Sequence, residues 1–226
     1  MERAATRELM DEDGSGTPRE VSGNFRDIAL INAWLGGVRT TITEVDRLPV
    51  TPRTILDVCT GGGDMPLALL DHLRSRGLAA SCVALDRSAS ALDAAATRVR
   101  GRSDIALVRG DALSLPYHDR TFDLVTCNLA LHHFEPADAV RALAEMARVG
   151  RDVIVNDLRR SAVGWMLACA VFPLFTRNRL TLHDGPLSVR RAYSPAEVHL
   201  FARDAGWTRA AVRTHFAARM TLAGGR

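Results

Sequence analysis

Short apolar segments alternate with amphipathic helical segments through the middle of the chain, and this alternation constrains the fold more than any other feature. The apolar segments have the length and β-branched content of buried strands, and they lie at 55–58, 82–85, 105–108, 122–129 and 152–155. Helical spacing follows three of them, at 64–76, 88–100 and 136–149. Strands and helices of this length form right-handed βαβ units. We therefore predict an α/β fold with a doubly wound, mostly parallel sheet.

The start of the chain lies outside this alternation. Residues 1–24 are charged or rich in Gly, Ser and Pro without apolar periodicity, so we expect a mobile tail there. Residues 25–50 carry apolar side chains every three to four positions and predict a helical cap, loosened at Gly36 and Gly37. If this cap closes a cofactor cleft, deletion of residues 1–47 should abolish cofactor affinity and leave a folded core.

We assign residues 51–226 to one domain, with an insertion at 159–194 that binds an acceptor or acts as a lid. The Arg-rich part of the insertion is polar and is expected to be a loop. After it, Ser194 and Glu197 have the spacing of a helix-capping box, which predicts a last helix. Two final strands are expected at 207–214 and 217–222.

Composition excludes several classes of function. All 29 basic residues are Arg, because the sequence contains no Lys, and this excludes lysine Schiff-base chemistry and a P-loop lysine. The Arg residues are scattered and the net charge is only +3, so we expect no nucleic-acid partner. The first residues lack the apolar stretch of a secretory signal, and the four Cys show no disulfide or metal spacing. We therefore expect a cytoplasmic protein with reduced thiols.

The sharpest local motif is a glycine turn, Asp57-Val-Cys-Thr-Gly-Gly-Gly-Asp64, between a predicted strand and a predicted helix. Consecutive glycines let a ligand lie against the main chain, and a helix start offers free N–H groups. Pro66 stands where a dinucleotide fingerprint requires Gly, so pyrophosphate binding is not expected. Asp86 ends the next strand, where a carboxylate can accept hydrogen bonds from ribose hydroxyls. A turn used only for packing and a merely solvated Asp86 are the alternatives.

Three further motifs follow the first in order. The four are TILDVCTGGGDMPLAL, VALDRS, VRGDALSLPYHDRTFDLVTCNLALHHF and VIVNDL, within residues 50–160. Together they resemble class I S-adenosylmethionine-dependent methyltransferases, and are similar to the small-molecule ubiquinone/menaquinone-type branch. The resemblance implies a Rossmann-like seven-stranded sheet with an antiparallel last strand, and S-adenosylmethionine as cofactor. The cofactor residues that it implies are Cys59, Thr60, Gly61, Gly63, Asp86, Arg87, Asp111, Ala112 and Asn128. Cys59 departs from the family, which usually has glycine at this position.

A methyl acceptor must be positioned, shielded from water and, if it is a hydroxyl, deprotonated. His132 and His133 follow the fourth predicted strand, and we expect His132 to face the cleft as the base and His133 to be structural. In the alternative, both histidines only cap the turn. Further candidates for acceptor binding are Asp157, His183, Arg190 and Tyr193, and His183 is also a catalytic candidate. Asp157, His183 and Asp184 are metal-ligand residue types, but their spacing matches no known metal motif, so we expect no metal.

The run at 162–175 is apolar on all sides but too short to span a bilayer. We expect it to be buried against the sheet, and an acceptor pocket or contact with a membrane surface is the alternative. The predicted function is methyl transfer to a small apolar or aromatic acceptor of phenolic, quinone or polyketide-like type, with oxygen favoured as the methylated atom. A nucleic-acid methyltransferase and a non-catalytic S-adenosylmethionine-binding protein are the alternatives. The acceptor and the oligomeric state stay open.

Overall fold

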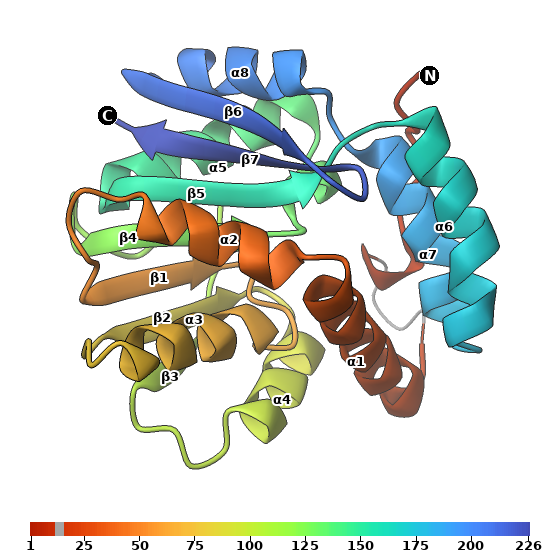
Figure 1. Cartoon of the computed structure of the whole chain (residues 1–226), viewed down its shortest axis with the longest axis horizontal. Coiled ribbons are helices and arrows are strands. Elements are labelled where there is room, and N and C mark those ends of the chain that lie inside the picture. Colours follow the sequence, from red (N-terminus) through yellow and green to blue (C-terminus); the bar gives the residue numbers. More distant parts are fainter. Residues whose placement is uncertain (12–15) are drawn as a thin grey trace.

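The computed structural model describes residues 1–11 and 16–226, which include a seven-stranded sheet in the order β3-β2-β1-β4-β5-β7-β6 (Figure 1). The strands are β1 (Thr54–Val58), β2 (Ser81–Asp86), β3 (Ile105–Arg109), β4 (Phe122–Asn128), β5 (Gly150–Leu158), β6 (Arg209–His215) and β7 (Arg219–Gly225). The first five are parallel, and β7 is antiparallel to both β5 and β6. The predicted doubly wound sheet with an antiparallel last strand is confirmed.

Helices cover both faces of the sheet (Figure 1). One face carries α2 (Gly37–Asp46), α3 (Asp64–Ser75) and α4 (Ala89–Arg98), and the other carries α5 (Pro136–Val149) and α8 (Pro195–Asp204). Strands covered on both faces must be apolar at successive positions. For example, Ile55 faces one core cluster and Leu56 faces the other, and both are fully buried. This explains why the central strands appear in the sequence as near-continuous apolar runs.

The remaining helices lie beyond the carboxyl ends of the parallel strands (Figure 1). They are α1 (Pro18–Trp34), α6 (Ala162–Phe175), α7 (Arg179–Arg191) and the short 3-10 turns η1 (Leu9–Asp11) and η2 (Leu131–His133). In open α/β sheets this edge is where ligands bind. These elements therefore surround the region in which the sequence predicts a site.

The N-terminal cap is two helices, and it begins earlier than predicted. Thr17 and Glu20 form a capping box, in which the Glu20 N–H donates to Thr17 Oγ1 and the Thr17 N–H donates to Glu20 Oε2, so α1 begins at Pro18 rather than near residue 25. Gly36 has a left-handed backbone, with φ of +77°, and separates α1 from α2. The predicted boundary between tail and cap is therefore wrong, because capping chemistry rather than apolar spacing starts this helix.

Residues 1–11, here called the N-terminal strap, lie against the rest of the domain. The Ala4 N–H donates to Arg190 O at 3.0 Å, and the Leu9 and Met10 N–H groups donate to the two carboxylate oxygens of Asp184. Glu8 is buried. The predicted mobile tail did not anticipate these contacts, and its residues 12–15 lie outside the described residues.

The Arg-rich segment predicted as a loop is helix α7. Its buried positions recur every three to four residues, as expected for a helix, but most of them are polar: Leu180, Thr181, Asp184, Ser188, Val189 and Arg191. The prediction was wrong because a buried polar face leaves no apolar periodicity to recognise. Asn178 caps the start of α7 through a hydrogen bond from the Leu180 N–H at 2.9 Å.

The apolar run forms α6, which packs on α7 rather than on the sheet. Only Ala168 is buried, whereas Val163, Met166 and Leu167 are each more than half exposed. The prediction of burial against the sheet is therefore wrong, and α6 instead lines the cavity described below. Among the described residues, no helix is long and apolar enough to cross a membrane.

Candidate active site

A cavity of about 1020 Å³ lies at the carboxyl ends of the strands. The glycine turn, the ends of β2 and β4, η2, α1, α6, α7 and the β6–β7 turn all contribute to its lining. Ligand pockets generally occupy about 300 to 1,000 Å³. This cavity is therefore large enough for a nucleoside-sized ligand together with a second small molecule.

The glycine turn forms one wall. Gly61 lies in the left-handed region, with φ of +54°, and the Phe25 side chain of α1 packs over the turn. A Cβ atom on Gly62 would lie 2.9 Å from the Cβ of Phe25, so a side chain there would collide with α1. The cavity is lined by Cys59, Thr60, Gly61 and Gly62, whereas Gly63 instead faces Ala95 of α4. Three of the four turn residues named from the sequence therefore line the cavity, and Gly62 rather than Gly63 is the fourth lining residue.

Asp86 is attached to the same turn. Its carboxylate accepts hydrogen bonds from the Gly61 N–H and from the Ser88 N–H, both at 2.9 Å. A carboxylate has about four lone-pair positions, so two remain for donors in the cavity that Asp86 lines. Asp86 thus both holds the turn and presents acceptors suited to a ribose diol.

The other predicted cofactor residues also line this end of the cavity. These are Arg87, Asp111, Ala112 and Asn128. Asp111 accepts a hydrogen bond from the Leu113 N–H at 2.9 Å, which orders the loop after β3. S-adenosylmethionine carries a ribose diol, which donates hydrogen bonds, and a purine ring. A carboxylate is suited to the diol, and the adjoining loop with its apolar side chains is suited to the purine. The residues present therefore fit this cofactor.

Asp57 is a buried carboxylate beneath the turn. It accepts hydrogen bonds from Thr126 Oγ1 at 2.6 Å and from Asn128 Nδ2 at 3.3 Å. Burial raises the pKa of Asp57 to about 6, although these hydrogen bonds oppose the shift. Asn128 is held from its other side by Thr41 of α2, whose hydroxyl donates to Asn128 Oδ1 at 2.8 Å. This network ties the ends of β1 and β4 to the cap.

Arg219 is a site residue that the sequence analysis missed. It is only 1% exposed, yet it lines the cavity. Its Nη2 donates to Asn32 Oδ1 at 2.9 Å, while Nε and Nη1 have no partner among the described residues. Burial lowers the pKa of Arg219 to about 10, so the guanidinium remains charged at neutral pH. In the sequence it is one of 29 scattered Arg residues, and no local signal distinguishes it.

His132 lines the cavity, and Asp157 fixes its orientation. The His132 N–H donates to Asp157 Oδ2 at 2.8 Å, and Nδ1 lies 2.6 Å from Asp157 Oδ1. Burial opposes the charge of Asp157, but its interactions with the His132 side chain and with backbone N–H groups hold its pKa below its usual range. Asp157 does not line the cavity, so it supports His132 rather than reaching an acceptor itself.

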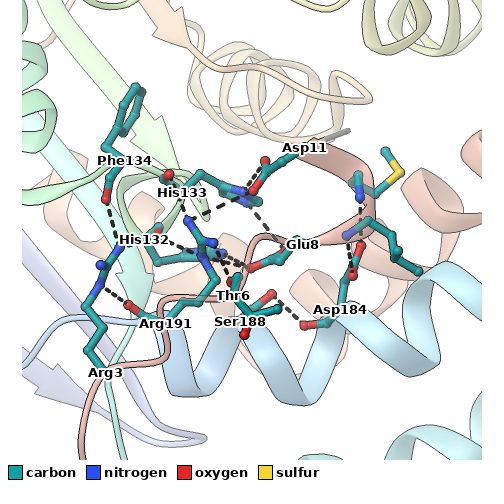
Figure 2. A network of polar contacts seen from close by, with 12 residues as sticks. Arg3, Thr6, Glu8, Asp11, His132, His133, Phe134, Asp184, Ser188 and Arg191 are labelled. Carbon is teal, nitrogen blue, oxygen red and sulfur yellow. Dashed lines mark hydrogen bonds and ion pairs between the residues drawn. The ribbon is translucent and has the colours of Figure 1, made fainter. Parts of the chain in front are cut away.

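His133 is held in a similar way from the N-terminal strap. Its Nδ1 lies 2.7 Å from Asp11 Oδ1, and burial opposes its charge. Glu8 and Asp11 overcome this opposition and raise the pKa of His133 to about 9. Figure 2 shows how Glu8 of the strap lies between both imidazoles and the Arg191 guanidinium.

The strap residues and Arg191 were not predicted. Arg191 is buried and donates to the backbone oxygens of Thr6 and His133 at 2.6 and 3.0 Å, which joins the strap to η2 (Figure 2). Glu8 and Asp11 lie in a segment expected to be mobile, far in sequence from the histidines. Only the tertiary fold places them beside η2.

Besides Asp157, three further predicted acceptor residues do not line the cavity. His183 is exposed and pairs with the adjacent Asp184 at 2.7 Å, and Arg190 is exposed on the outer side of α7. Tyr193 is buried, donates its hydroxyl to Phe134 O at 2.7 Å and lies under the Arg3 guanidinium. The expectation that these side chains meet an acceptor is corrected here, because α7 turns its other face to the cavity.

A large part of the cavity lining is apolar. Its apolar side chains include Ile28, Ile31, Leu35, Val163, Leu167, Val171, Phe172 and Phe216. These residues come from α1, α6 and the β6–β7 turn. The apolar face of α6 forms one side of this lining. This position agrees with the alternative that residues 162–175 line an acceptor pocket.

Comparison with known proteins agrees with this geometry. Residues 55–152 match the methyltransferase domain family. The chain is 35% identical over 133 residues to the demethylmenaquinone methyltransferase of Lactobacillus johnsonii, covering 54% of this chain and 52% of that protein. It is 32% identical over 173 residues to the chloroplastic 2-phytyl-1,4-beta-naphthoquinone methyltransferase of Arabidopsis thaliana, covering 69% of this chain and 64% of that protein. The chain thus spans about half to two thirds of the length of these relatives.

A solved S-adenosylmethionine-dependent methyltransferase from Aquifex aeolicus shares the fold, with a TM-score of 0.65 and 17% identity over 92% of this chain and 98% of that chain. The sheet order, the glycine turn with Asp86 and the matched domain all lead to one assignment. Residues 55–152 form a methyltransferase domain, and the chain is similar to class I S-adenosylmethionine-dependent methyltransferases of the quinone-type branch.

Proposed function

We propose that this protein transfers the methyl group of S-adenosylmethionine to a small, largely apolar acceptor that carries an ionisable hydroxyl or enol. The observation that carries the proposal is the continuity of one cavity, in which a nucleoside-type site adjoins an apolar compartment with a polar cluster at their edge. When bound, S-adenosylmethionine supplies an electrophilic methyl group. The residues of this chain bind, orient and shield the two ligands.

At the cofactor end, Asp86 accepts from the ribose hydroxyls and the Cys59–Gly62 turn lies along the methionine portion. Arg219, with two unpartnered guanidinium nitrogens beside Asn32, is suited to the carboxylate of that portion. Phe25 of α1 covers the turn and excludes water from it. Asp111 and Ala112 adjoin the adenine.

At the acceptor end, the apolar lining from α1 and α6 favours an aromatic ring or hydrocarbon over a charged macromolecule. The curated relatives are named for quinone substrates, and a hydroxylated aromatic ring of similar chemistry fits the compartment. The Glu8, His132 and His133 cluster lies where the acceptor hydroxyl would lose its proton, which favours oxygen as the methylated atom.

The experiment is a calorimetric titration of the full chain with S-adenosylhomocysteine, with NADH as the competing ligand. We expect saturable binding of S-adenosylhomocysteine alone, and at least a 10-fold loss in Asp86→Ala, because hydrogen bonds to a charged group each contribute about 1.5–3 kcal/mol. Asp93→Ala, an exposed carboxylate on α4, is the matched control and should bind normally. Lack of binding by folded wild-type protein would refute the proposal.

A further inference from the structure

Both imidazoles of η2 are oriented by carboxylates. Asp157 lies against Nδ1 of His132 and Asp11 lies against Nδ1 of His133, at 2.6 and 2.7 Å. An ionised carboxylate only accepts hydrogen bonds, so each Nδ1 carries a hydrogen. The Nε2 atoms are therefore the free ligand atoms, and both are directed toward Glu8 (Figure 2). Carboxylates behind the Nδ1 atoms are the usual support of metal-binding histidines.

The separations at Glu8 do not fit hydrogen bonds. Nε2 of His132 lies 3.5 Å from Glu8 Oε1, and Nε2 of His133 lies 3.8 Å from Glu8 Oε2. A charge-assisted hydrogen bond would be about 2.7–2.9 Å long. Ligand atoms about 2.0–2.1 Å from a tetrahedral zinc ion are about 3.4 Å apart, which is close to these distances.

Glu8 itself lacks a hydrogen bond at one oxygen. The residue is 3% exposed, and its Oε1 has no hydrogen-bond partner among the described residues. Arg191 is the closest guanidinium, with Nε 3.9 Å from that oxygen. A buried carboxylate oxygen is costly unless a donor or a cation satisfies it. The ligand atoms of Glu8, His132 and His133 all lie within 4.8 Å of one another.

The local charges are also unbalanced. With both imidazoles neutral, Glu8, Asp11 and Asp157 contribute three negative charges. Arg191 contributes one positive charge, and Arg219, which attracts Asp157, contributes a second. The nearby Arg3 is already paired with Glu135 at 3.1 Å. Negative charge therefore remains in excess, and either a bound cation or protonation of an imidazole would balance it.

We propose that Glu8, His132 and His133 form a site for one first-row divalent cation of the zinc type, open on its cavity side to the acceptor. Two nitrogens and one carboxylate suit Zn²⁺ or Co²⁺ and disfavour the oxygen-seeking Mg²⁺ and Ca²⁺. The sequence analysis expected no metal because the spacing of Asp157, His183 and Asp184 matches no metal motif, and it did not consider Glu8, which lies more than 120 residues before the two histidines.

This inference rests on the proposed function and deepens it. The cation would bind the hydroxyl oxygen of the acceptor and lower the pKa of that hydroxyl, and the released proton would pass to bulk water. His132 then acts as a ligand rather than as the base. The N-terminal strap becomes part of the acceptor site, since it provides Glu8 directly and supports His133 through Asp11.

The test uses the full, tag-free chain, stripped with a chelator and then titrated with Zn²⁺ against a chromophoric competitor. We expect one tight site per chain, no comparable site for Mg²⁺, and a visible spectrum of low-coordinate Co²⁺ in the cobalt-loaded protein. Glu8→Gln and His133→Asn should each weaken Zn²⁺ binding at least 100-fold. Asp11→Asn retains all three ligands and should weaken it about 10- to 100-fold. His199→Asn, at an exposed position of α8, is the matched control and should bind as the wild type does.

S-adenosylhomocysteine binding in chelator separates this inference from the proposed function. The glycine turn does not contact the cluster, so each variant should retain that binding, which also shows that it is folded. Two outcomes would overturn the metal site alone. In the first, wild-type protein binds S-adenosylhomocysteine but not Zn²⁺. In the second, Glu8→Gln binds Zn²⁺ as tightly as the wild type does. Failure to bind S-adenosylhomocysteine would overturn the proposed function instead.

Discussion

Cys59 takes a backbone conformation that favours glycine. Its φ of +56° lies in the left-handed region, in the turn that lines the cofactor end of the cavity. A left-handed residue other than glycine costs roughly 1–2 kcal/mol. Its thiol adjoins Cys127 at the end of β4, and this neighbour together with burial raises the pKa of the Cys127 thiol. The turn thus keeps its geometry without the glycine that the family usually has.

We expect the size and branching of residue 59 to decide whether the turn forms. Cys59→Val should lower the free energy of unfolding by about 2 kcal/mol and weaken S-adenosylhomocysteine binding, because a β-branched residue is strained at positive φ. Cys59→Gly should retain binding, because glycine adopts this conformation freely. Urea denaturation and calorimetry of both variants measure the effect, and equal behaviour of the two would contradict it.

Asp57 should make stability depend on pH. Its pKa is raised from 3.8 to about 6 in the folded protein, by burial and by the neighbouring Asp64, so the folded state holds its proton more tightly than the unfolded state. This stabilisation is complete below about pH 3.8 and is lost as the pH rises through about 6, a change of about 3 kcal/mol. Asp57→Asn removes the titration.

Urea denaturation at several pH values between 4 and 7 measures this effect as the difference in the free energy of unfolding between Asp57→Asn and the wild type. Thr60, Thr126 and Asn128 contact the carboxyl group but do not titrate, so any lost hydrogen bond adds a constant offset. The variant should gain stability relative to wild type as the pH rises. A difference that does not vary with pH would show that Asp57 has an ordinary pKa.

At the scale of elements, α1 and α2 have different roles although both belong to the predicted cap. Phe25 and Asn32 of α1 contact the glycine turn, Asp64 and Arg219, so α1 closes the cavity. Thr41 and Val45 of α2 are buried against the sheet, where Thr41 also bonds Asn156 at 2.9 Å. Only α1 has the position of a lid.

Two deletions distinguish these roles. Deletion of residues 1–35 should leave a cooperatively unfolding core and weaken S-adenosylhomocysteine binding at least 10-fold, because Phe25 no longer covers the turn. Deletion of residues 1–47 should lose the folded core as well, because α2 covers one sheet face. This revises the expectation that the longer deletion leaves the core intact. Circular dichroism and calorimetry decide, and unchanged affinity after the shorter deletion would exclude a lid.

Element prediction succeeded where burial coincided with apolar side chains. The central strands and α5 have clear periodicity, and they appear close to the predicted ranges. The prediction for α7 failed because its buried side chains include Asp184 and Arg191, which form hydrogen bonds to the N-terminal strap, and Ser188, which donates to the backbone of α7 itself. A helix whose buried face is polar has the same residue pattern as a solvated loop until its partners are known.

At the scale of the whole molecule, the predicted cofactor site is assembled from strand ends that are neighbours in the sheet, whereas the proposed acceptor site is assembled from segments far apart in sequence. Asp57, Asp86 and Asn128 end β1, β2 and β4, and parallel pairing brings such ends to one edge. Their motifs could therefore be predicted. The acceptor end combines the strap, α1, η2, α6 and α7, and no single segment carries its chemistry.

The sequence by itself determined the doubly wound sheet, the glycine turn and the carboxylate beside it, because strand periodicity and glycine conformations are local properties of the chain. It also determined that His132 lies at the cavity, since η2 directly follows β4. The tertiary structure alone decided that Glu8 joins the two histidines, that Arg219 reaches the cavity and that Tyr193 turns away. Those outcomes depend on which distant segments pack together, and pairing between buried polar groups leaves no periodic pattern in either partner.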